Sequence, residues 1–236
     1  MKERVRVHKV RLGGDEFRVI RPEPSPARLA LRDDHHWLSM YVDRAGAERL
    51  VALWALAARS ARSLIHLPIR ANPAPEGVVG VVDGGDGGDG GDGGDGEPVA
   101  LDLLLLHHSL RFPTASWKPV RSRLDTGRPQ TTATPDRDFP DEDAIDHERR
   151  FYRSYRDHLA FDIAAHTLFV VGSPTAFREH GTALRGLVDE APSFPYRFPH
   201  AGHFCVELNS GPWARIRNRR RLSATLHIQY SADWRV

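Results

Sequence analysis

The first forty residues contain short apolar runs broken by polar turns, a pattern that predicts β structure. Two runs rich in β-forming residues, 3–12 and 16–20, flank the sequence Gly-Gly-Asp and predict a hairpin. Two further runs, 27–31 and 37–42, flank the polar sequence RDDHH and predict a second hairpin. The N-terminal half is therefore expected to be rich in strands.

The apolar positions then change to helical spacing. Asp43 is a suitable N-cap. After it, four apolar side chains form one stripe along a predicted helix over 45–61: Leu50, Leu53, Trp54 and Ala57. We expect this helix to cover one face of the preceding sheet. A shorter helix is predicted over 115–124, with Pro119 near its first turn.

The apolar runs 63–69 and 99–106 predict two neighbouring strands. The chain between them is rich in Pro, Gly and Asp, and residues 83–96 are a pure repeat of aspartate and two glycines. Loop-closure entropy rises only slowly with length, so we expect 73–98 to be a flexible loop insertion. Residues 125–140 are expected to form a polar surface loop.

The second half mixes helices and strands. Asp141 is expected to cap a helix that carries Ile145 and Leu159, and residues 166–171 predict a buried strand. Ser173 and Pro174 are typical of a helix N-cap and first turn. Two last strands, 203–209 and 221–230, are expected to pair in antiparallel orientation.

These elements predict an α+β fold with mostly antiparallel sheets and surface helices, β-rich in its N-terminal half and mixed in its C-terminal half. The length of 236 residues suits a single domain or two closely packed lobes, 1–124 and 141–236.

Charge and cysteine content narrow the possible classes of protein. The formal net charge is +2, and it would be +8 without the six acidic residues of 83–97. That is less basic than a dedicated nucleic-acid binder. All but three of the 33 basic residues are arginine, which is typical of a GC-rich bacterial genome. A single cysteine excludes an intramolecular disulfide, and no run approaches the length of a membrane span. We expect a soluble, cytoplasmic protein.

The strongest candidate for chemistry is a group at the start of the strand 203–209. On a strand, His203, Cys205 and Glu207 share one face, and His200 is close in sequence. Together these four residues could bind zinc or iron. Alternatively, His203 could activate Cys205 as a nucleophile. Packing of a buried cysteine is the simpler interpretation.

A second polar group lies in the predicted turn at 33–36. Asp34 and His36 could act as a general base and acid, although Asp and His are also common in turns for structural reasons.

A third candidate is the arginine row RIRNRRR at 215–221. If this segment is extended, one face presents the four alternate arginines: Arg215, Arg217, Arg219 and Arg221. Such a row suits an acidic protein surface or nucleic acid, with Trp213 available for stacking.

The chain lacks a P-loop, an H-E-x-x-H sequence and a G-x-S-x-G elbow, and the glycine repeat is not followed by the helix that a dinucleotide site requires. No residues for an organic cofactor are predicted, and the identity of any cofactor stays unknown. The first hypothesis is a non-catalytic binding, regulatory or immunity-type protein of unknown partner. One alternative is a metal-dependent or Cys/His hydrolase that uses the His200–Glu207 group. Another is a nucleic-acid-binding protein that uses the arginine row.

Overall fold

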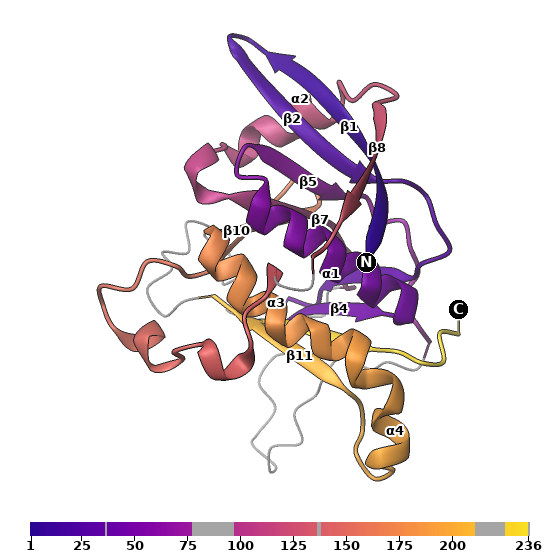
Figure 1. Cartoon of the computed structure of the whole chain (residues 1–236). Coiled ribbons are helices and arrows are strands. Elements are labelled where there is room, and N and C mark those ends of the chain that lie inside the picture. The colour runs from indigo at the N-terminus through magenta and orange to yellow at the C-terminus, as the bar shows by residue number, and fades with distance from the viewer. Residues whose placement is uncertain (36, 77–96, 136–137, 211–224, 236) are drawn as a thin grey trace.

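The computed structural model describes residues 1–35, 37–76, 97–135, 138–210 and 225–235, which form two β-sheets with helices between and around them (Figure 1). One sheet has seven strands: β1 (Lys2–Leu12), β2 (Asp15–Pro22), β5 (Ser63–Leu67), β7 (Asp102–His107), β8 (Arg128–Ala133), β9 (Ala160–Ala164) and β10 (Thr167–Gly172). The other has five: β3 (Leu29–Asp33), β4 (Leu38–Val42), β6 (Val99–Ala100), β11 (Cys205–Asn209) and β12 (Thr225–Tyr230). The helices are α1 (Arg44–Arg59), α2 (Trp117–Arg121), α3 (Pro174–Asp189) and α4 (Phe194–Arg197).

Pairing within the sheets confirms the α+β, mostly antiparallel prediction. The strand orders are β8-β1-β2-β5-β7-β10-β9 and β11-β12-β4-β3-β6. The predicted hairpins form as β1–β2, where Gly13 has φ +63°, and as β3–β4. Strands β5 and β7 are antiparallel neighbours, as are β11 and β12. Three parallel pairs, β2–β5, β7–β10 and β4–β12, join the hairpins into the two sheets.

Helix α1 is buried between the two sheets rather than covering one of them. It contacts β1, β5 and β7 of the large sheet and β4 of the small one, and it packs along α3. Residues 50–58 of this helix are all buried, so its apolar surface extends around the whole circumference. A helix that is apolar on all sides belongs in an interior. The single stripe of four residues therefore underestimated how much of this helix is covered.

Trp54 joins α1 to α3 at the centre of this layer. Its indole Nε1 donates a 2.6 Å hydrogen bond to the carbonyl oxygen of Phe177, and the two rings meet edge to face with centroids 5.1 Å apart. Both side chains are fully buried. The contact satisfies the indole N–H, which is costly to leave without a partner in an apolar interior.

The opposite face of the large sheet has its own core. Leu64, Leu104 and Phe169 pack there against Trp117 of α2. At one end of the same face, buried Asp102 accepts hydrogen bonds from the backbone N–H of Arg70 and from the Arg121 guanidinium. Burial opposes ionisation of Asp102, but the nearby His66 and the hydrogen bond from the backbone of Arg70 outweigh it and lower the pKa of Asp102.

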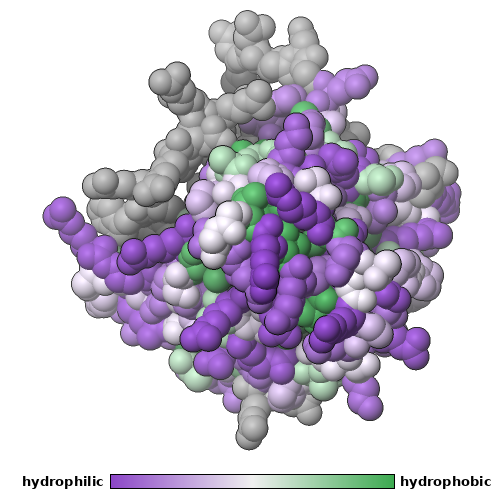
Figure 2. All heavy atoms as spheres, turned by 90° about the horizontal axis from the view of Figure 1, so that it is seen from above, coloured by the Kyte–Doolittle hydropathy of each residue, from purple (hydrophilic) through white to green (hydrophobic). Residues whose placement is uncertain are grey.

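The large sheet draws strands from both sides of the 125–140 segment, which itself contains the edge strand β8 with mostly exposed side chains. Most of the expected loop insertion, 77–96, lies outside the described residues. Among the residues that are described, no helix has the length and apolar character needed to cross a bilayer. The face seen from above is mostly polar, with apolar side chains visible between the polar ones (Figure 2).

Helix α3 begins as expected, with the Ser173 hydroxyl accepting from the N–H of Ala176 and Pro174 in the first turn. The prediction of a helix after Asp141 is wrong. The chain instead makes short 3-10 turns at Glu142–Ala144 and Glu148–Phe151. The sequence from 146 to 150 is wholly polar and offers no continuous apolar stripe for a helix to bury.

Contacts with α3 hold this segment in place. Glu179, only 7% exposed, forms ion pairs with Arg149 and Arg150 and accepts a 3.1 Å hydrogen bond from the Tyr155 hydroxyl. One turn further on, Thr182 donates a 2.7 Å hydrogen bond to the carbonyl of Pro140. The segment therefore follows α3 through polar contacts that its own hydrophobic pattern does not reveal.

We expect the substitution Gly181→Ala to destabilise the protein. A Cβ at this position would overlap the ring of Phe139, whereas nothing lies within 4 Å of a Cβ at Gly202. Overpacking of this kind costs about 1–3 kcal/mol, more than the gain of an alanine in a helix. Thermal and urea unfolding of Gly181→Ala and of the control Gly202→Ala measure the difference. Equal stability of the two variants would contradict the packing at Phe139.

We also expect acid to weaken the fold through His180. Burial, together with the positive charge of Arg150 and the neighbouring His158 and His147, lowers the pKa of His180 from 6.5 to about 4. Between these two values the unfolded chain binds a proton that the folded chain does not, so stability falls as the pH drops through this window. Melting temperatures from pH 7.5 to 4.5 should decline less steeply for His180→Gln than for the wild type. The control is His200→Gln, at an exposed position, and an unchanged slope for His180→Gln would refute the assignment.

Candidate metal centre

Strands β11 and β12 place one set of side chains in the core and the other on the outer face of the small sheet. Val206 and Leu208 of β11 belong to the central core, as do Leu226 and Ile228 of β12. Because side chains alternate along a strand, the intervening positions lie on the opposite face. That face carries Cys205 and Glu207 from β11 and, from β12, His227, which is the cross-strand partner of Glu207.

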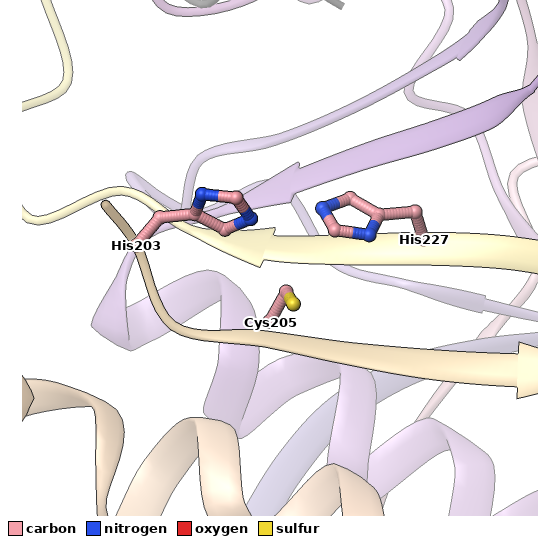
Figure 3. Close-up of side chains that lie close together, drawn as sticks. All are labelled: His203, Cys205 and His227. Carbon is pink, nitrogen blue, oxygen red and sulfur yellow. The ribbon is translucent and has the colours of Figure 1, made fainter. Parts of the chain in front are cut away.

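Three potential metal ligands converge at the start of β11. The ligand atoms of His203, Cys205 and His227 all lie within 4.8 Å of one another. Figure 3 shows the two imidazole rings facing each other across the strands, with the Cys205 sulfur beside the space between them. The ring centroids are 5.3 Å apart and the ring planes meet at 74°. Ligands of a tetrahedral zinc ion are roughly 3.5 Å apart, so an ion would draw these groups inward by about 1 Å.

His227 is the most deeply buried member, with 6% exposure. Its Nδ1 lies 3.8 Å from Glu207 Oε1, while its buried Nε2 has no hydrogen-bond partner among the residues that the structure describes. Buried ring nitrogens are normally satisfied. Burial lowers the pKa of His227 and the adjacent His203 lowers it further, which keeps the imidazole neutral, the form that binds metals.

Cys205 is partly exposed, and His203 is exposed on the loop before β11. Burial raises the pKa of the Cys205 thiol, and the charge of Glu207 raises it further. A raised pKa is unfavourable for a nucleophilic cysteine, which must be a thiolate near neutral pH. A bound metal ion removes the thiol proton directly, so this environment fits a metal ligand better than a nucleophile.

The cluster differs in part from the group expected from the sequence. His203 and Cys205 belong to it, but His200 lies outside it in an exposed turn and Glu207 contacts His227 instead. The missed member, His227, lies in the middle of the final predicted strand. Because it alternates with the apolar Leu226 and Ile228, the sequence already places His227 on the polar face of that strand. The pairing register of β12 with β11 was also needed to place it beside Cys205 and Glu207.

The turn at 33–36 lies near the same face of the small sheet. Ser39 of β4 is in register with His227 of the parallel strand β12, and its hydroxyl donates to the carboxylate of Asp34. Asp33 accepts from the backbone N–H of His35, which has φ +66°. Both carboxylates therefore stabilise the turn, while His36 lies outside the described residues. A catalytic role for Asp34 and His36 stays a prediction.

The expected arginine row, Arg215 to Arg221, and Trp213 fall within 211–224, outside the described residues. Contact of this row with an acidic surface or nucleic acid also stays a prediction.

The fold and the candidate centre stand on this chain's own residues, because comparison with protein-family models, curated proteins and solved structures gave no match.

Proposed function

We propose that the protein is a zinc-dependent hydrolase whose metal ion is held by His203, Cys205 and His227. The observation that carries this proposal is the convergence of three ligand atoms within 4.8 Å of one another, one of them a buried imidazole nitrogen without a partner. The proposal makes the alternative hypothesis from the sequence specific, with His227 in place of His200 and Glu207.

The ligand set favours zinc among the common divalent ions. Imidazole and thiolate together suit zinc, whereas calcium and magnesium prefer oxygen ligands. Glu207 supports the site in a second way. A carboxylate beside Nδ1 of His227 favours a proton on that nitrogen and leaves Nε2 free for the metal, an arrangement common around zinc-bound histidines.

The number of ligands, three among the residues that the structure describes, favours catalysis over a purely structural ion. Structural zinc sites have four protein ligands, whereas catalytic sites have three and keep the fourth position for water. Here His203 is exposed and Cys205 is partly exposed, so solvent reaches one side of the cluster. A zinc ion lowers the pKa of bound water to about 7 and thereby supplies hydroxide for attack on an ester, amide or phosphate.

The first experiment measures metal binding. We expect the purified protein, stripped with a chelator, to bind one zinc ion per chain, and cobalt(II) to give the visible absorption of a tetrahedral thiolate complex. His227→Ala should abolish stoichiometric binding, and Cys205→Ser should remove the thiolate contribution to the cobalt spectrum. Glu207→Gln should weaken zinc binding roughly tenfold, as expected for a residue that orients a ligand.

His200→Ala is the matched control, because His200 is close in sequence but outside the cluster. It should bind zinc as the wild type does. If the wild type binds no zinc, or if His200→Ala and His227→Ala weaken binding equally, the proposed centre is wrong.

The second experiment measures hydrolysis by the zinc-loaded protein. With p-nitrophenyl acetate as a generic substrate, we expect activity that is lost on chelation, restored by zinc and absent from His203→Ala. The rate should rise with pH as the bound water ionises near pH 7. Stoichiometric zinc without any hydrolysis of esters, phosphoesters or peptides would refute the enzyme and leave a non-catalytic metal-binding protein.

A further inference from the structure

A second site stands out at the opposite sheet, where a cavity of about 460 Å³ opens beside the strands β1 and β2. Its size falls within the range of small-molecule sites. Its lining includes the apolar residues Leu29, Leu67 and Ile69. It also includes the polar residues Arg6, His8 and Arg21. The cavity is therefore amphipathic, and both kinds of residue restrict what can bind.

The guanidinium groups around the cavity differ in whether they have partners. Arg6 forms a 3.3 Å ion pair with Glu23 and donates to the carbonyl of Thr126. Arg49 forms a 2.8 Å ion pair with Glu3. Arg21, in contrast, is partly buried and has neither a hydrogen bond nor an ion pair with any residue that the structure describes.

Asp102 does not neutralise Arg21. Its charge acts on Arg21 from a distance, and its oxygens already accept from the backbone of Arg70 and from Arg121. A guanidinium without a carboxylate partner in the lining of a cavity is well suited to pair with the carboxylate of a ligand.

His8 is buried and closely packed at the side of the cavity. His8 is 3% exposed, and its Nδ1 lies 2.9 Å from Asp125 Oδ1, which also accepts from the N–H of Gly127. Gly127 has φ +67°, and a Cβ there would lie 2.6 Å from the His8 ring. The Nε2 of His8 has no hydrogen-bond partner within the described part of the chain. His8 therefore lies in the lining of the same cavity as Arg21, with its own Nε2 enclosed.

The charges that line the cavity limit the ligand to one negative charge. Of the three arginines at the cavity, Arg6 is paired with Glu23 and Arg49 with Glu3, so Arg21 alone is left to pair with a ligand. The carboxylates of Glu23 and Asp125 in the lining would repel a second negative charge on the ligand. We propose that this cavity binds a small organic acid with a single carboxylate, which pairs with Arg21, and an apolar body, which packs on Leu29, Leu67 and Ile69.

Calorimetric titration with phenylacetate tests this proposal. We expect phenylacetate to bind at least about tenfold more tightly than phenylacetamide, its neutral analogue, because the amide cannot form the charge-assisted hydrogen bond that the carboxylate forms with Arg21. Acetate should bind more weakly than phenylacetate, because it lacks the apolar body. Inorganic phosphate, largely a dianion at pH 7.5, should bind more weakly as well. All titrations are made at matched ionic strength.

Arg21→Gln should weaken phenylacetate binding about tenfold or more and leave the melting temperature unchanged or raised, since the substitution removes an unpaired charge. Arg11→Gln is the control, because Arg11 lies on the adjacent strand β1 with an 82% exposed side chain. Equal binding of the acid and the amide, tighter binding of phosphate, or an equal effect of both substitutions would overturn the proposal. Because the ligands contain no hydrolysable ester and no metal is added, failure here is separate from failure of the zinc centre.

Discussion

The hydrogen bond and ring contact between Trp54 and Phe177 hold together the layer on which the whole fold depends. Helix α1 has a sheet on each side and packs along α3, which contributes the Phe177 contact. Among the described residues the strands form two separate sheets, and this pair of helices packs between them. Their relative position, and hence that of both candidate sites, depends on this helix pair together with the hydrophobic core that the two sheets share.

Much of this arrangement follows from local pattern. The hairpins β1–β2 and β3–β4, the pair β5–β7 and the cap of α3 at Ser173 were all predictable from residues close together in sequence. The errors have a common physical origin. The second buried side of α1 and the short 3-10 turns after Asp141 both depend on distant partners, the small sheet in the first case and Glu179 in the second.

The residues of the candidate metal centre also divide into those that local sequence pattern predicts and one that depends on a distant partner. His203 and Cys205 were found because they lie two residues apart at the start of one strand. His227 was missed because it reaches them only through the register of β11 on β12, in which Glu207 is opposite His227. A register shift of one residue would turn His227 into the core. The centre is therefore specified by the hydrophobic pattern of β12 as much as by its ligands.

The position of β12 in the small sheet has a consequence for biosynthesis. This strand lies between β11 and β4, so the sheet joins an early part of the chain to a late one. A nascent chain in which β3 and β4 have already paired still exposes the edge that β12 will cover, and none of the three ligands has yet been made. Closure of that edge and assembly of the ligand cluster are then one event that must wait for the synthesis of β12, so that acquisition of a metal ion would mark a chain whose small sheet is complete.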